Sequence, residues 1–122
     1  MSTAAPRDYT SPYRLFGAIA AIAAIAIVLL LAVWLGLHWY VAWLAGWSVV
    51  TFIFYGYDKM QSQRDGGRVP ELVLHGMALI GGFPGGWAGR AVFRHKTRHG
   101  SFTAVLVLAT VIHAVFAFWV LL

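Results

Sequence analysis

The sequence has no cysteine among its 122 residues, which excludes disulfides and thiolate metal sites. Charged side chains are also scarce, at 11% of the chain, whereas hydrophobic residues make up 61%. A water-soluble domain cannot bury that much apolar surface, so the composition predicts an integral membrane protein. Only four acidic residues oppose nine Lys and Arg residues. Because these charges flank apolar stretches, we assign them to anionic lipid headgroups and expect no nucleic-acid partner.

Long stretches without charge define the expected membrane spans. Residues 15–37 carry no charged side chain and would form a helix about 34 Å long, enough to cross the hydrocarbon core. One helix through residue 57 would reach about 65 Å, twice that thickness, so we expect a break at 36–38 and a second span at 39–57. The last span is expected at 101–122.

The third apolar segment, at 72–89, is interrupted by residues that break helices. Proline lacks an amide donor, and glycine has a low helix propensity. Unpaired backbone is prohibitively unfavourable in hydrocarbon, so a break at this depth must be covered by protein or water. Two forms stay open: a re-entrant hairpin that enters and leaves by the same face, and a kinked fourth span. The expected backbone break comprises Gly81, Gly82, Pro84, Gly85 and Gly86.

The distribution of basic residues favours the re-entrant form. A third segment that spans fully would leave five Lys and Arg residues on one side of the membrane and four on the other. A re-entrant segment leaves all nine on one side, which the positive-inside rule makes cytoplasmic. We therefore expect an all-α, polytopic membrane protein with three full transmembrane helices and a broken third segment. Its short cytoplasmic tail covers 1–14, and a single helical membrane domain covers 15–122.

Four sequence motifs follow one another between residues 55 and 102: Y-G-Y-D-K, R-V-P-E, A-L-I-G-G-F-P-G-G-W-A-G and F-R-H-K-T-R-H-G-S-F. In combination they resemble a bacterial membrane family called domain of unknown function 1294. The resemblance implies a multi-pass protein of the bacterial inner membrane with a cytoplasmic amino terminus, and it implies no established activity. The motif-bearing residues correspond here to Asp58, Lys59, Arg68, Pro70, Glu71, Arg94, His95, Lys96, Thr97 and Phe102.

In the re-entrant form, the polar residues of both flanking loops converge on one membrane face. Arginine forks fit phosphate oxygens, and lipid phosphates are abundant at that depth. Asp58 and Glu71 would support the cations, and amides of the backbone break would add donors. Without any ligand, the same charges would still orient the protein. We expect membrane lipids as partners, at a lipid-phosphate or other anion site made of Lys59, Arg68, Arg94, His95, Lys96, Thr97 and Arg98.

An accessory or structural role in a membrane complex is a second hypothesis. Small residues allow helices to approach closely. They recur at helical spacing on one face of the first span, which would pack against another helix, in a membrane-protein partner or a second copy of the chain. This face consists of Gly17, Ala21, Ala24, Val28 and Ala32.

A membrane enzyme acting on a lipid or polyprenyl phosphate is a third hypothesis. His95 would transfer the proton, and Asp58 or Glu71 would orient the imidazole. No nucleophile motif is recognisable, so we lean against an enzyme. We expect neither metal nor cofactor, because cations surround His95 and its neighbour at position 99. His75 and His113, in apolar segments, are expected to hydrogen-bond a backbone carbonyl or a hydroxyl.

Overall fold

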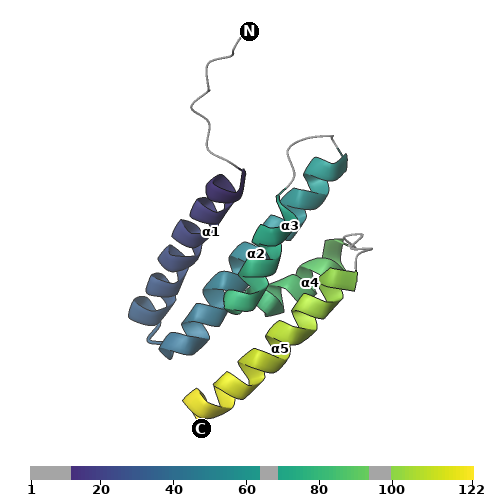
Figure 1. The fold of residues 1–122 in the computed structure, drawn as a ribbon. Coiled ribbons are helices and arrows are strands. Elements are labelled where there is room, and N and C mark those ends of the chain that lie inside the picture. The colour runs from purple at the N-terminus through teal and green to yellow at the C-terminus, as the bar shows by residue number, and fades with distance from the viewer. Residues whose placement is uncertain (1–11, 64–68, 94–99) are drawn as a thin grey trace.

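The computed structural model describes residues 12–63, 69–93 and 100–122, and every regular element in these ranges is a helix. Three of the helices are long and apolar enough to cross a membrane. The predicted all-α class and three membrane-length helices are therefore confirmed (Figure 1). The elements are α1 (Pro12–Leu29), the π-helical turn η1 (Leu30–Trp34), α2 (Trp39–Gln63), α3 (Glu71–Met77), the π-helical turn η2 (Ala78–Gly82), α4 (Phe83–Phe93) and α5 (Gly100–Leu121).

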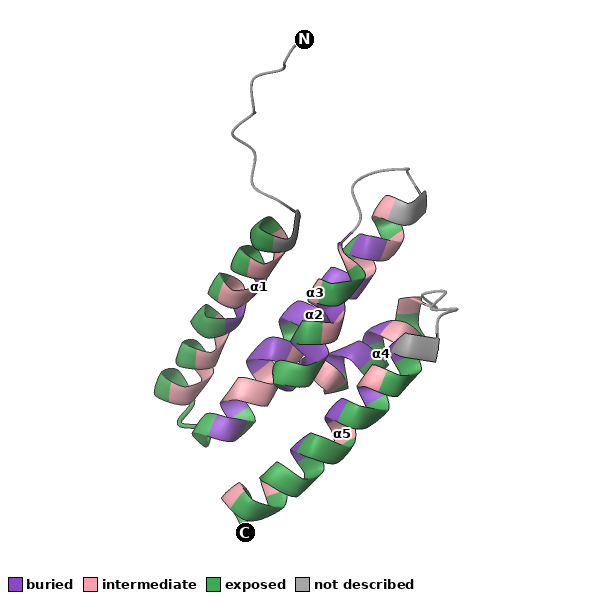
Figure 2. Ribbon diagram, viewed as in Figure 1, coloured by how far each residue is buried: buried purple, intermediate pink, exposed green. Residues whose placement is uncertain are grey.

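Helix α2 lies at the centre of the molecule. It contacts α1, α3, η2 and α4, and α5 packs on η2 and α4. Figure 1 shows α1 and α5 at opposite outer edges. Buried residues concentrate on α2 and on the α3–α4 segment, whereas the outward faces of α1 and α5 are exposed and apolar (Figure 2). Lipid tails are as apolar as these side chains, so such faces suit contact with hydrocarbon.

Helix α1 packs on α2 through the small-residue face predicted from the sequence. Ala24 is fully buried, and a Cβ on Gly46 of α2 would lie 2.6 Å from Cγ2 of Val28 and 3.1 Å from the Ala24 carbonyl oxygen. Only a glycine at position 46 permits this approach. At Ala24 and Val28, the face proposed for another helix therefore packs against this chain's own α2.

The α3–α4 segment leaves the helical conformation at Gly81, where φ is 148° and ψ is −4°. This backbone conformation is open to glycine and strained for any residue with a Cβ. Pro84 lies in the first turn of α4, where its missing amide removes no helical hydrogen bond. A Cβ on Gly85 would overlap the carbonyl oxygen of Ser48, so the backbones of α4 and α2 are in direct contact.

Two side chains bind the backbone carbonyls that precede Gly81. The indole N–H of Trp43 donates to the Ile80 carbonyl at 2.6 Å, and Nε2 of His113 lies 2.7 Å from the Leu79 carbonyl. These carbonyls come just before the point where the helical hydrogen-bond pattern is interrupted. Side chains of the protein therefore satisfy backbone carbonyls that the interrupted helix leaves without a helical partner.

His113 also fixes the orientation of a tyrosine hydroxyl. A carbonyl only accepts hydrogen bonds, so Nε2 carries the proton, and in the neutral ring Nδ1 accepts from the Tyr40 hydroxyl at 2.6 Å. The expectation that this histidine bonds a carbonyl or a hydroxyl is confirmed, because it bonds both. The network joins α2, η2 and α5.

Candidate functional site

The buried carboxylate of Asp58 fixes the start of the α3–α4 segment. Asp58 lies near the end of α2 and is only 1% exposed. Its Oδ1 accepts a hydrogen bond of 3.0 Å from the backbone N–H of Val69, which is itself buried. A buried carboxylate needs such partners to offset its lost hydration. Pro70 and α3 follow directly, so this bond holds the start of the α3–α4 segment against α2.

The next residue, Lys59, binds the other end of the same segment. Its ammonium group donates to the backbone carbonyl of Phe93, the last residue of α4. The last carbonyls of a helix lack intrahelical partners and favour a cation. The Phe93 ring also packs on Phe52, with centroids 5.0 Å apart, and covers Gly56. Adjacent residues of α2 thus bond the first and last parts of the described 69–93 segment.

Helix α5 begins at the same end of the molecule. Phe102, in its first turn, meets the His75 ring at a centroid distance of 4.6 Å and the Tyr55 ring at 6.3 Å. Nε2 of His75 lies 3.4 Å from Oε1 of Glu71, one turn earlier on α3. This contact is close enough for an ion pair when the imidazole is protonated but is not aligned as a hydrogen bond. His75 therefore differs from the expectation of a carbonyl or hydroxyl partner.

Arg90 is a basic residue outside the site predicted from the sequence. It lies in the last turn of α4 and is half-buried. Its neighbour Gly89 packs against Tyr55, where an added Cβ would come within 2.9 Å of the tyrosine Cβ. Arg90 thus stands next to the part of α2 that carries Asp58. The signal in the sequence was its position at the start of the run 90–99, which holds four of the nine Lys and Arg residues.

Some predicted site residues lie together and others lie apart. Asp58, Lys59 and Glu71 are at the end of α2 and the start of α3. The glycines of the break pack deeper on α2: Gly82 contacts Thr51, which precedes Asp58 by two helical turns, about 10 Å. Outside the described residues lie Arg68, Arg94, His95, Lys96, Thr97 and Arg98.

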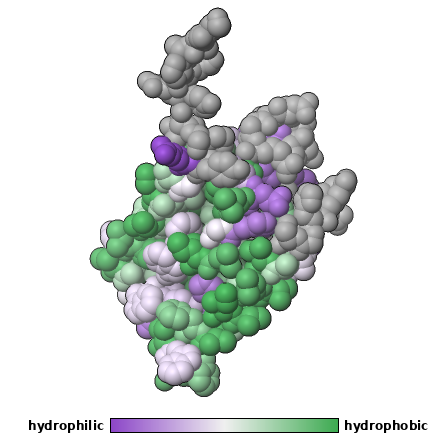
Figure 3. All heavy atoms as spheres, in the orientation of Figure 1, coloured by the Kyte–Doolittle hydropathy of each residue, from purple (hydrophilic) through white to green (hydrophobic). Residues whose placement is uncertain are grey.

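The surface reflects the same division. Figure 3 shows hydrophobic residues over most of one face, with hydrophilic residues gathered toward the end of the molecule at which α1 begins. Within the described ranges, no group of three or more His, Asp or Glu side chains could hold a metal ion. The polar chemistry among described residues at this end includes a buried acid, an exposed acid, a histidine and cations.

We expect Asp58→Ala to lower the free energy of unfolding by about 2–3 kcal/mol, because the buried Val69 amide loses its acceptor. Asp58→Asn keeps an oxygen acceptor at the same position and should cost clearly less. Unfolding of the purified protein by SDS titration, followed by circular dichroism, measures both. Equal losses for the two variants would show that the bond to Val69 is unimportant for stability.

Comparison with known proteins identifies a matching family and a related protein. A family model described as "Protein of unknown function (DUF1294)" matches residues 48–102. This range includes Asp58, Lys59, Phe93 and Phe102. The uncharacterized protein YsdA of Bacillus subtilis (strain 168) is 40% identical over 60 residues, which cover 49% of this chain and 67% of YsdA. No solved structure matches the chain.

Proposed function

This chain belongs to the DUF1294 family, and we propose that its residues 69–93 form a re-entrant hairpin that gathers basic residues at one membrane face to bind a lipid phosphate or a related anion. The observation that carries the proposal is the pair of bonds from Asp58 to Val69 and from Lys59 to Phe93. Adjacent residues of one helix thereby contact both ends of the glycine-rich segment.

The contacts along α2 support the re-entrant form. The segment begins beside Asp58, and Gly81 packs against Trp43. Trp43 precedes Asp58 by fifteen residues on α2, which is about 22 Å along the helix axis. Farther along the chain, Gly89 packs against Tyr55, and Phe93 contacts Lys59 again. A descent of about 22 Å stays within a hydrocarbon core about 30 Å thick. The bonds to the Leu79 and Ile80 carbonyls meet the backbone requirement at the turning point.

The charge pattern supports an anion site on the cytoplasmic face of the bacterial inner membrane. In the sequence, Arg68 directly precedes Val69 and Arg94 directly follows Phe93. Each basic segment is thus one residue, about 3.8 Å between Cα atoms, from backbone bonded to α2. With a re-entrant segment and a cytoplasmic amino terminus, all nine Lys and Arg residues share one side. Guanidinium groups bind phosphate in a bidentate fashion, and each cation near an anionic surface contributes about 1 kcal/mol.

The test is lipid retention by the detergent-purified protein, in which membrane orientation plays no part. Arg94→Ala combined with Lys96→Ala should reduce phosphatidylglycerol retention in native mass spectrometry about tenfold or more, because two cations are lost. The exchange Arg94→Lys with Lys96→Arg conserves charge and should retain lipid nearly as well as the parent protein. Arg7→Ala, in the amino-terminal tail, controls for bulk charge. Unchanged retention in the double alanine variant would refute the proposal.

A further inference from the structure

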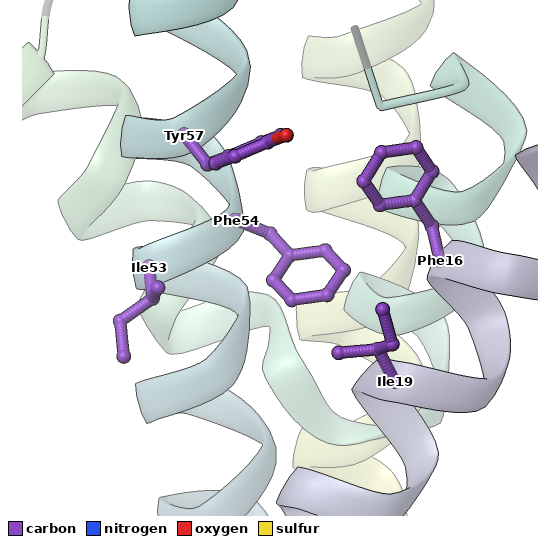
Figure 4. A pocket seen from close by; sticks show the side chains of 5 residues that line it. All are labelled: Phe16, Ile19, Ile53, Phe54 and Tyr57. Carbon is purple, nitrogen blue, oxygen red and sulfur yellow. The ribbon is translucent and has the colours of Figure 1, made fainter. Parts of the chain in front are cut away.

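A concave apolar groove of about 210 Å³ lies between α1 and α2. Its aromatic side chains pack against one another across the two helices: the Phe16 ring meets Phe54 edge-on at 6.2 Å and lies 6.0 Å from the Tyr57 ring. One end of the groove is at Tyr57, the residue before Asp58 and Lys59, so this end lies at the same end of α2 as these two residues of the candidate anion site. Figure 4 shows the side chains that line it: Phe16, Ile19, Ile53, Phe54 and Tyr57.

Polar atoms occur only at that end of the groove. Of the five lining side chains, Tyr57 alone has one, and its ring extends from α2 toward Phe16 with the hydroxyl at the leading edge (Figure 4). Arg14, an exposed cation in the first turns of α1, precedes Phe16 by two residues. The groove therefore presents hydrocarbon along its length and a hydroxyl at one end, and the turn of α1 before Phe16 carries a positive charge. A phospholipid has the same order of groups: acyl chain, ester carbonyl and phosphate.

The size of the groove indicates how much of a ligand it can enclose. Pockets that bury a whole small molecule have volumes of about 300–1,000 Å³. This smaller groove suits part of one acyl chain, with the rest of the lipid in the bilayer. Lipid tails are as apolar as the groove, so burial alone gives no strong preference for one lipid. The acyl chain would be oriented by packing against the rings of Phe16, Phe54 and Tyr57. The lipid headgroup would be selected at the polar end of the groove.

We infer that the groove binds one acyl chain of an anionic phospholipid, with the Tyr57 hydroxyl donating to the ester carbonyl and Arg14 beside the phosphate. This inference rests on the proposed function and narrows it, because the anion becomes a membrane diacyl lipid and not a soluble phosphate. The ligand would lie against both α1 and α2, whereas the bonds of Asp58 and Lys59 join α2 to the two ends of the segment 69–93.

Filling the groove tests the inference. Ile19→Phe should reduce retention of phosphatidylglycerol about fivefold or more in native mass spectrometry, and Ile53→Phe provides the same test from α2. Ile22→Phe is the matched control: it makes the same change on α1 at a side chain that is 71% exposed and outside the groove. Tyr57→Phe, which removes only the hydroxyl, should reduce retention about twofold. Binding of glycerol phosphate, which has no acyl chain, should be unchanged in all four variants.

Several results would overturn the inference. The Ile19→Phe and Ile22→Phe variants should both be monodisperse in size-exclusion chromatography. If they then retain phosphatidylglycerol equally well, the groove does not bind an acyl chain. Equal retention of phosphatidylcholine and phosphatidylglycerol by the parent protein would remove the anionic selectivity. If the parent protein is a dimer and Ile19→Phe makes it a monomer without changing lipid retention, the groove binds a second copy of the protein and not a lipid. Failure of the proposed function has a different signature: Arg94→Ala with Lys96→Ala would leave both lipid and glycerol phosphate binding intact.

Discussion

A cysteine introduced at Thr97 should stay unlabelled when intact cells are treated with a membrane-impermeant maleimide, whereas one at Leu37 should be labelled. The chain has no cysteine of its own, so each signal reports the introduced residue. In the re-entrant form, Thr97 shares the cytoplasmic side with Lys59, and the connection between η1 and α2 lies on the opposite side. Leu37 is preferable to His38, because Nδ1 of His38 accepts a hydrogen bond from the Tyr40 amide at the start of α2.

The contrast is close to all or none, since the reagent does not cross the membrane. Met60→Cys is the matched reference for the cytoplasmic side: Met60 is exposed near the end of α2 and next to Lys59. Permeabilised cells should label all three positions and so establish that each thiol reacts. A kinked fourth span predicts instead that position 97 labels in intact cells while position 60 does not. That result would separate the two basic segments and remove the proposed site.

Gly85→Ala should lower the free energy of unfolding by about 3 kcal/mol, while Gly76→Ala should raise it by up to about 1 kcal/mol. At Gly85 the added Cβ would overlap the Ser48 carbonyl oxygen and lie 2.7–2.8 Å from two further backbone atoms of Ser48. Backbone atoms of a packed helix cannot move aside as a flexible side chain can, so the cost reaches the upper end for overpacking. At Gly76 nothing lies within 4 Å of the new methyl group, and alanine favours the helix.

The pair is informative because identical substitutions should act with opposite signs. SDS titration of the purified variants, followed by circular dichroism, gives both values. The two glycines lie on α3 and α4, so general damage to the segment would affect both. An unchanged free energy of unfolding for Gly85→Ala would mean that α4 and α2 leave room for the added methyl group. The close approach would then contribute little to the stability of the glycine-rich segment.

The helical class and the long helices could be predicted because they follow from local composition. Runs without charge and of membrane length have few alternatives to a helix. The end of α2 was harder to predict from the sequence. The second span was expected at 39–57, yet the helix continues to Gln63. Hydropathy detects only the apolar part of a helix, whereas Lys59, Met60 and Gln61 are good helix formers that extend it into a polar environment.

The partners within the site could not be predicted from one sequence. The motifs drew attention to Asp58 and Lys59, but neither residue type specifies a backbone amide or carbonyl as its partner. Val69 and Phe93 are apolar, and their side chains give no sign that their backbone groups bond to α2. The break amides were expected near the anion site because the glycines are close to it in sequence. Their packing on α2 depends on the direction of the chain after Pro70, which local patterns do not determine.

The two bonds at Leu79 and Ile80 have a consequence for biogenesis. The donor to Ile80 comes from α2, which is synthesised before the glycine-rich segment, but the donor to Leu79 comes from α5, which is synthesised after it. A nascent chain that has emerged only as far as α4 therefore has one of the two donors. Both carbonyls before Gly81 have their side-chain donors only after α5 has been synthesised, so the packing of the final helix is the closing step of assembly.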